Sequence, residues 1–209
     1  MGVKEQEITI EGPDVKLEGL LTRGNRTPGV LVAHPHPQNG GNMFNNVVAK
    51  VCETFYKMGY WTLRFNFRGV GLSTGEYGDG LLEQDDYMYA LDAFSKHLGK
   101  RPPIVCAGYS FGSYVVYKSM ERISKPSKIL LIAPPLNVMD FDYEYHFNTC
   151  HRSHEITIII GDSDEFCSKE KVEHFAKHTK SRIKILKNVN HYFRGSGNKL
   201  EQEIKTCFQ

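Results

Sequence analysis

One segment of the chain has the residue pattern of a catalytic serine turn. In "VCAGYSFGSYVV" (105–116), the pattern G-x-S-x-G runs from Gly108 to Gly112 between an apolar run and an amphipathic stretch. In a nucleophile elbow, glycines beside the serine leave room for a strand and a helix to cross tightly, and the turn exposes the hydroxyl. We therefore predict Ser110 as a nucleophile and Gly108 and Gly112 as the elbow glycines. The alternative is that G-x-S-x-G occurs here by chance. A chance occurrence between a strand pattern and a helix pattern is less frequent than one elsewhere.

A serine becomes a useful nucleophile when a base takes its proton and an acid orients that base. Two apolar runs, at 155–161 and 182–187, lead into "GDSDEF" and "NVNHYF", which offer Asp162, Asp164 and His191. We predict His191 as the base and Asp164 as the acid. A carboxylate a few residues past the strand end can turn back toward the histidine, whereas Asp162 is better placed to stabilise the turn. Turn stabilisation is the alternative role for either aspartate.

The segment "AHPHPQNGG" (33–41) contains two histidines, His34 and His36, between prolines. A metal site is one interpretation, but zinc needs three or four converging ligands. The other histidine cluster, "HFNTCHRSH" (146–154), is irregularly spaced, so we expect His146, Cys150, His151 and His154 to be surface loop residues. The other interpretation is an oxyanion loop. Prolines have no N–H to donate, so His36 is the one donor between them. We predict that the N–H groups of His36 and Phe111 form an oxyanion hole, with no metal and no cofactor.

The order of elements predicts how these loops are brought together. An N-terminal antiparallel hairpin (6–12 and 15–23) is followed by strands expected at 29–34, 60–67, 103–109, 128–134, 155–161 and 182–187. Helices expected at 44–58, 81–98, 111–123, 169–179 and 198–208 alternate with them. This alternation predicts one α/β domain, 1–209, with a mostly parallel sheet covered on both faces. Loops that leave the carboxyl ends of parallel strands then meet at one edge.

Two further segments could contribute to a ligand-binding site. "FRGVGLSTG" (67–75) resembles a dinucleotide loop, but Thr74 stands where the third glycine is required, so we expect a wall of the active-site cleft instead. The stretch 134–154 is too short for a cap domain. Its alternating aromatic residues favour a small lid or acyl-pocket wall and a surface strand or loop about equally.

The composition of the chain limits which classes of function and location remain. The net charge of +2, with basic residues spread along the chain, gives no reason to expect nucleic-acid binding. Five cysteines without a C-x-x-C pair favour reduced thiols. There is no secretory apolar region and no run long enough for a membrane span. We expect a cytoplasmic protein with a small-molecule acyl substrate, and its oligomeric state stays open.

The chain resembles the α/β-hydrolase superfamily, and more narrowly small, nearly cap-free members related to dienelactone hydrolases and carboxylesterases. The resemblance covers almost the whole chain and rests on "AHPHPQNGGNMFNNVV", "LRFNFRGVGLSTGEY", "AGYSFGSYVV", "LIAPPL", "IIGDSDE" and "NHYF", in that order. It implies Ser110 as nucleophile, Asp164 as triad acid and His191 as base. Dienelactone hydrolases proper use a cysteine nucleophile, so their lactone substrate is not implied.

The expected function is therefore a serine hydrolase that cleaves a small ester, thioester or related acyl compound through an acyl-enzyme. A peptidase or amidase with the same triad is one alternative. A non-catalytic protein that binds a small ligand is the other, but all three triad residue types are present, which counts against it.

Overall fold

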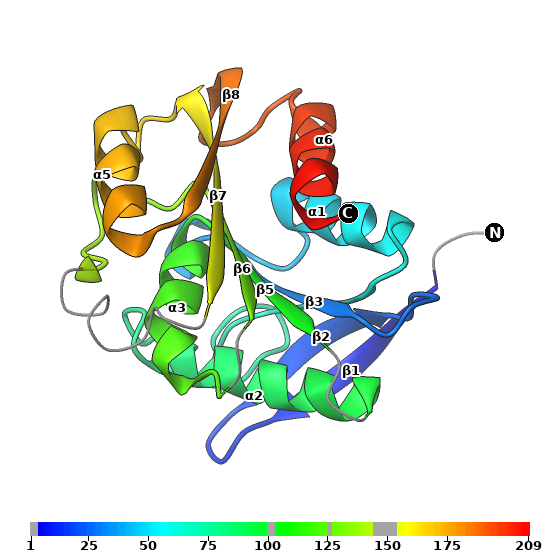
Figure 1. Cartoon of the computed structure of the whole chain (residues 1–209). Coiled ribbons are helices and arrows are strands. Elements are labelled where there is room, and N and C mark those ends of the chain that lie inside the picture. Colours follow the sequence, from blue (N-terminus) through cyan, green and yellow to red (C-terminus); the bar gives the residue numbers. More distant parts are fainter. Residues whose placement is uncertain (1–3, 100–102, 125–126, 144–153) are drawn as a thin grey trace.

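The computed structural model describes residues 4–99, 103–124, 127–143 and 154–209. Within them an eight-stranded sheet has the order β1-β2-β4-β3-β5-β6-β7-β8 (Figure 1). The strands are β1 (Glu5–Glu11), β2 (Lys16–Thr22), β3 (Gly29–Ala33), β4 (Trp61–Phe65), β5 (Ile104–Tyr109), β6 (Lys128–Ile132), β7 (Glu155–Ser163) and β8 (Arg182–Asn190).

The predicted fold class is confirmed. β1 and β2 form the N-terminal antiparallel hairpin, and β2 pairs antiparallel with β4. Across the rest of the sheet, β4, β3, β5, β6, β7 and β8 lie in this order, and each pairs in parallel with its neighbours. Every residue of β3 is buried, as expected of a central strand covered on both faces. The parallel strands therefore end on the same edge of the sheet, where the predicted site loops begin.

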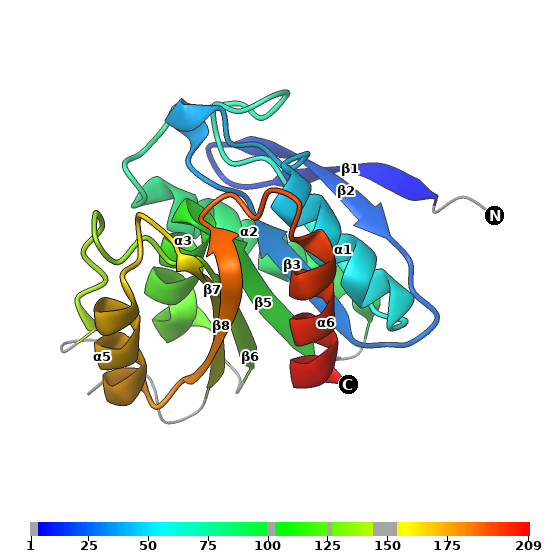
Figure 2. The same cartoon turned by 90° about the horizontal axis from the view of Figure 1, so that it is seen from above.

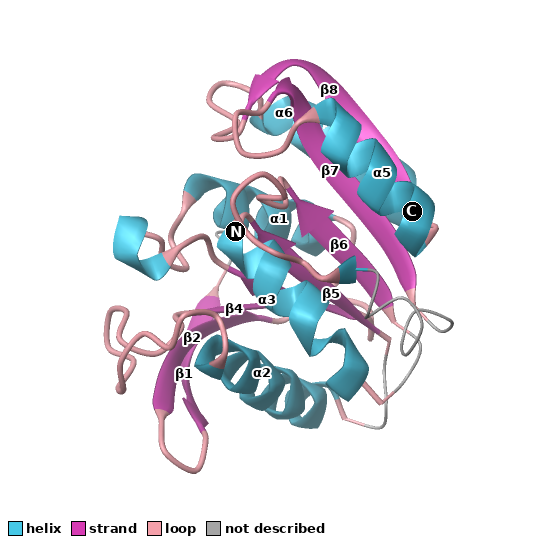
Figure 3. Cartoon of the chain, turned by 90° about the vertical axis from the view of Figure 1, so that its left-hand side faces the viewer, coloured by secondary structure: helices cyan, strands magenta, loops and turns pink. Residues whose placement is uncertain are grey.

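Helices cover both faces of the sheet (Figure 2). α1 (Asn46–Lys57) and α6 (Gly197–Phe208) pack on one face around Phe55, Leu200 and Phe208. α2 (Leu82–Leu98), α3 (Phe111–Ser119) and α5 (Lys169–Thr179) pack on the other face and lie in front of the sheet in Figure 3. Two apolar cores, one on each side, hold the strand ends in place.

Local side-chain bonds explain where several elements differ from the prediction. α1 begins two residues later than expected because the Asn45 side chain accepts a hydrogen bond from the Val47 N–H and caps the helix. The helix expected at 111–123 is α3 followed by a short 3₁₀ turn, Met120–Arg122. β7 and β8 extend beyond their apolar runs through an irregular register in which Ser163 pairs with Asn190. This extension places His191 directly after the end of β8.

No helix in the described parts of the chain combines the length and the apolar character needed to cross a membrane.

Candidate active site

The turn between β5 and α3 has the strained geometry of a nucleophile elbow. Ser110 has φ 54° and ψ −119°, a conformation that a residue with a side chain rarely adopts. Its N–H donates to the Ile132 carbonyl at 2.9 Å, which ties the turn to the end of β6. A Cβ at Gly108 would collide with the Gly112 carbonyl, and a Cβ at Gly112 would collide with the Ala33 carbonyl. Close approach of backbone to backbone therefore requires both glycines.

The structure brings Ser110, His191 and Asp164 together. His191 Nε2 lies 2.9 Å from Ser110 Oγ, and His191 Nδ1 lies 3.0 and 2.9 Å from the two Asp164 carboxylate oxygens. An ionised carboxylate can only accept a hydrogen bond, so Nδ1 carries the imidazole proton. Nε2 is then free to accept the proton of the serine hydroxyl. This is the relation between base and nucleophile that acyl transfer requires.

The two aspartates of the "GDSDEF" segment have different surroundings. Asp164 is buried and also accepts a hydrogen bond from the Phe166 N–H at 2.9 Å. Asp162 is exposed, and its Oδ1 accepts from Ser163 Oγ at 3.0 Å and from the Val189 N–H at 3.4 Å. A backbone hydrogen bond from Asn188 is the main cause that lowers the pKa of Asp162. Asp162 thus ties β7 to β8 beside their irregular register, while Asp164 reaches the histidine.

His36 and Phe111 lie where an oxyanion hole is expected. Phe111 is the first residue of α3, so its N–H has no acceptor within the helix. His36 precedes the 3₁₀ turn Pro37–Asn39, and its carbonyl accepts from the N–H groups of Asn39 and Gly41. Neither the His36 nor the Phe111 N–H has an acceptor among the described residues. Both residues line the same cavity as Ser110 and His191.

His34 has a structural role. It is buried, with Nδ1 2.6 Å from the Pro35 carbonyl and Nε2 accepting from the Phe67 N–H at 3.0 Å. Both ring nitrogens are used, and the ring holds the end of β3 against the end of β4. In the described ranges no three His, Cys, Asp or Glu side chains gather in a way that could hold a metal ion.

The stability of the protein should fall in acid because of His34. Burial lowers the pKa of His34 from its ordinary value of 6.5 to about 4, against a smaller opposite effect of its bond to Pro35. Between these values the unfolded chain binds the additional proton, so the stabilisation is complete above about pH 6.5 and is lost as the pH falls toward 4, about 3 kcal/mol in all. Urea unfolding across this range should show a shallower pH dependence for His34→Gln than for the wild type. Equal pH dependence in the two proteins would contradict this role.

The cavity has a volume of about 780 Å³ and is lined by two kinds of residue. Two asparagines, Asn39 and Asn45, contribute amide groups. The larger group is mainly apolar and aromatic and consists of Pro35, Tyr109, Phe111, Pro135, Val138, Met139, Phe166 and Tyr192. The described residues that line the cavity include no aspartate, glutamate, lysine or arginine.

Sequence reasoning had not identified several of these residues. The Phe166 ring lies 4.7 Å from the His191 ring, and the Tyr109 hydroxyl donates to the His191 carbonyl at 3.0 Å. Both are adjacent to predicted site segments, so position along the chain was an available signal. Val138 and Met139 lie in the stretch 134–154, for which an acyl-pocket wall was one of the alternatives, but the sequence did not single out these two residues.

The segment 67–75 does not have the expected place. Its residues are absent from the described cavity lining. It lies against β2, where the Thr74 N–H donates to the Lys16 carbonyl at 2.9 Å and the Glu18 N–H donates to Ser73 Oγ at 3.0 Å. Arg68, at its start, forms a buried ion pair with Asp86 of α2, at 2.7 Å. The expectation of a cleft wall was therefore wrong, because polar groups in this segment have their partners on the opposite strand.

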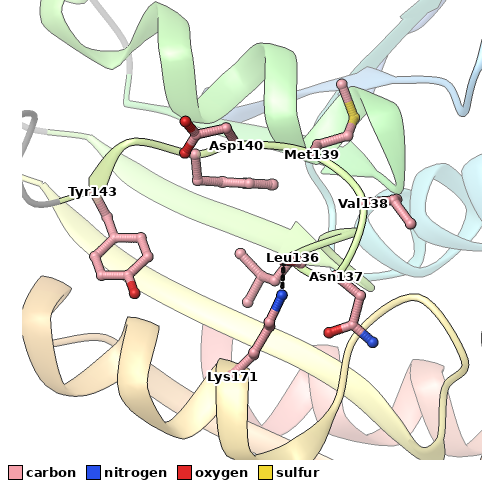
Figure 4. Close-up of a pocket in the computed structure, with 8 residues that line it drawn as sticks. Leu136, Asn137, Val138, Met139, Asp140, Tyr143 and Lys171 are labelled. Atoms are coloured by element: carbon pink, nitrogen blue, oxygen red, sulfur yellow. Dashed lines mark hydrogen bonds between the residues drawn. The ribbon is translucent and has the colours of Figure 1, made fainter.

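The stretch 134–154 is described in part. Val138 and Met139 line both the main cavity and a smaller neighbouring hollow of about 390 Å³ (Figure 4), so this segment separates the two. Lys171 of α5 enters the smaller hollow and donates to the Leu136 carbonyl at 3.2 Å. Phe141 is buried in the core. The lid prediction for 144–153, and the surface-loop prediction for His146, Cys150 and His151, lie outside the described residues. His154, which was predicted with them, is half-buried, and its Nδ1 accepts from the Ser127 N–H at 3.2 Å.

The chain matches one family model and a bacterial relative. The Hydrolase_4 family model, described as serine aminopeptidase S33, matches residues 38–147. An uncharacterised protein of Rickettsia prowazekii (strain Madrid E) is 31% identical over 198 residues, which are 90% of this chain and 82% of that protein.

Solved structures are similar over nearly the full length. An α/β serine hydrolase homologue from Coxiella burnetii superposes with a TM-score of 0.88 at 28% identity, covering 98% of this chain and 97% of its own. A lidless α/β serine hydrolase from Xanthomonas campestris has a TM-score of 0.83 at 23% identity, with 99% and 94% covered, and supports the fold.

Proposed function

The chain belongs to the α/β-hydrolase family of the serine aminopeptidase S33 type, and from this premise we propose that it cleaves small uncharged esters through an acyl-enzyme on Ser110. The observation that carries the proposal is the continuous hydrogen-bonded series from Asp164 through His191 to the strained Ser110. Thioesters and related acyl compounds follow the same chemistry.

In the first half of the reaction Ser110 Oγ attacks the acyl carbon while its proton passes to His191 Nε2. Asp164 accepts from Nδ1 and stabilises the imidazolium that forms. The negative charge moves to the former carbonyl oxygen, which the N–H groups of Phe111 and His36 hold. The position of Phe111 at the start of α3 adds the positive end of the helix dipole.

The tetrahedral intermediate then collapses. The bond to the leaving group breaks, His191 Nε2–H protonates the departing oxygen or sulfur, and the acyl group stays on Ser110. A water molecule repeats the sequence, giving its proton to Nε2 and its oxygen to the acyl carbon. The carboxylic acid is released, and Ser110 recovers its proton from His191.

The cavity lining favours an uncharged substrate. An ion that enters a cavity loses hydration, and this loss is compensated only by an opposite charge or several hydrogen bonds. The described lining has apolar and aromatic side chains and two amide side chains, with no carboxylate, lysine or arginine. The expected substrate is therefore uncharged and mainly apolar.

Aminoacyl amides are the second candidate, because the matching family model is described as a serine aminopeptidase. Recognition of a free α-ammonium group usually requires a carboxylate in the site, and none of the described residues that line the cavity provides one. Asp164 is not part of this lining, and His191 already uses its carboxylate. On this ground we place esters first.

A matched substrate panel tests the proposal. The values of kcat/KM are measured for short p-nitrophenyl esters and for aminoacyl p-nitroanilides, with N-acylated p-nitroanilides as the uncharged control. We expect esters to be hydrolysed fastest, and N-acylated amides to be cleaved better than those with a free ammonium. Preference for the free aminoacyl amides would reverse the ranking. No turnover of either class by folded protein would reject the hydrolase proposal.

A further inference from the structure

We propose that Tyr77 is a positioning residue for the oxyanion hole, acting through the side chain of His36; this inference rests on the proposed function. The Tyr77 hydroxyl lies 3.1 Å from His36 Nε2. Tyr77 is in the connection between β4 and α2, far along the chain from both oxyanion residues.

The two residues that supply the oxyanion N–H groups are in contact through their side chains. The His36 and Phe111 ring centroids are 4.9 Å apart. The Tyr77 ring lies 5.2 Å from His36 and 6.0 Å from Phe111, so it packs on both. The three rings thus couple the distance between the two N–H groups to the packing of one aromatic cluster.

His36 depends on this cluster for its orientation. Its carbonyl is held by the N–H groups of Asn39 and Gly41, and Pro35 and Pro37 restrict the backbone on each side. The ring is the second point of attachment, and Nδ1 is buried with no partner in the described chain. Among the described residues, the hydrogen bond with Tyr77 is therefore the polar contact that holds the ring. An oxyanion donor works best when it is fixed before the charge develops.

Tyr77 is itself held from the other side. Glu83, which is buried at the start of α2, accepts from the N–H groups of Gly78 and Gly80, each at 2.8 Å. This carboxylate ties the segment directly after Tyr77 to the first turn of the helix. A continuous series of contacts therefore runs from Glu83 through the 77–80 segment and the Tyr77 phenol to His36.

Protonation states agree with this geometry. Burial, with the charges of Glu83 and Asp79, raises the pKa of Tyr77 to about 12, and burial lowers the pKa of His36. Near neutral pH a neutral phenol therefore faces a neutral imidazole, and one hydrogen bond joins the hydroxyl to Nε2. Tyr77 is not among the described residues that line the cavity, so its effect on the reaction would pass through His36.

The test compares Tyr77→Phe with Tyr114→Phe. Tyr114 also packs against Phe111, at 6.4 Å, but none of its contacts in the described chain is with His36. We expect Tyr77→Phe to lower kcat about 5- to 10-fold with KM nearly unchanged, since one neutral hydrogen bond is lost. The Ki of a trifluoromethyl ketone, which forms a tetrahedral adduct with Ser110, should rise by a similar factor. Tyr114→Phe should retain the wild-type values, and both variants should keep the wild-type Tm.

A double-mutant cycle gives a second measurement. His36→Ala keeps the backbone N–H but removes the ring, so it should cost at least as much kcat as Tyr77→Phe. Adding Tyr77→Phe to His36→Ala should then cost nothing further, because the hydroxyl has no ring to hold. Additive losses, or an unchanged kcat and Ki in Tyr77→Phe, would overturn the inference while leaving the hydrolase proposal in place. An inactive wild type would overturn both.

Discussion

Ser110→Ala should abolish hydrolysis, with kcat/KM falling by roughly 10⁵-fold on the best ester. Alanine leaves the elbow backbone and the cavity in place but removes the oxygen that attacks the acyl carbon. Residual catalysis would come from water held near His191 and the oxyanion donors. The same substitution should abolish covalent labelling by a fluorophosphonate, which reacts with an activated serine hydroxyl and leaves one adduct in the intact mass spectrum.

Ser95→Ala is the matched control, since Ser95 lies on α2 and is not part of the described cavity lining. It should label and turn over like the wild type. An adduct that persists in Ser110→Ala would assign the nucleophile to another residue. A wild type that is folded but unreactive toward both the probe and the esters would favour the non-catalytic binding protein.

Asp164→Asn should have the second largest effect, a fall in kcat of about 10⁴-fold with little change in KM. The amide is close to the carboxylate in size and can still accept from the Phe166 N–H. It cannot stabilise the imidazolium, and its NH₂ group favours the imidazole tautomer that carries its proton on Nε2. That tautomer cannot accept the serine proton. The unchanged Phe166 contact predicts a Tm close to that of the wild type.

Asp162→Asn provides the comparison, because Asp162 is two residues away and exposed. Its amide oxygen can still accept from the Val189 N–H and Ser163 Oγ, so we expect nearly wild-type kcat and a small change in Tm. Steady-state kinetics of the two variants on one ester settle the assignment. Loss of kcat in Asp162→Asn with activity preserved in Asp164→Asn would exchange the two roles.

Tyr77 shows why parts of the site could not be read from the sequence. The triad residues follow strand ends in a fixed chain order, and the elbow glycines have a local pattern. Tyr77 and His36 are 41 positions apart and share no pattern. Their contact depends on how the connection before α2 folds back over the end of β3. The same holds for the role of Glu83, which looks in sequence like a surface residue of an amphipathic helix but is buried by its bonds to Gly78 and Gly80.

His34 and His36 give a second contrast. Their spacing suggests a pair with one role, yet the structure gives them different ones. His34 is buried between the ends of β3 and β4, whereas His36 contacts Phe111 and Tyr77 beside the cavity. Residues two apart point to the same face only along an extended strand, and β3 ends at Ala33. Beyond that residue, the turn at Pro37–Asn39 decides where each ring points.

The sequence by itself determined the strand and helix alternation and the elbow pattern, because apolar periodicity and glycine patterns act over a few neighbouring residues. It also predicted Asp164 and His191 as partners of Ser110. Only the tertiary structure gave the strand order, the extension of β7 and β8 that places His191, the short distance from Asp164 to His191, and the contact of Tyr77 with His36. These features depend on contacts between distant segments. A hydrogen bond forms or fails over a few tenths of an ångström, and packing of the whole sheet and its helices sets that distance.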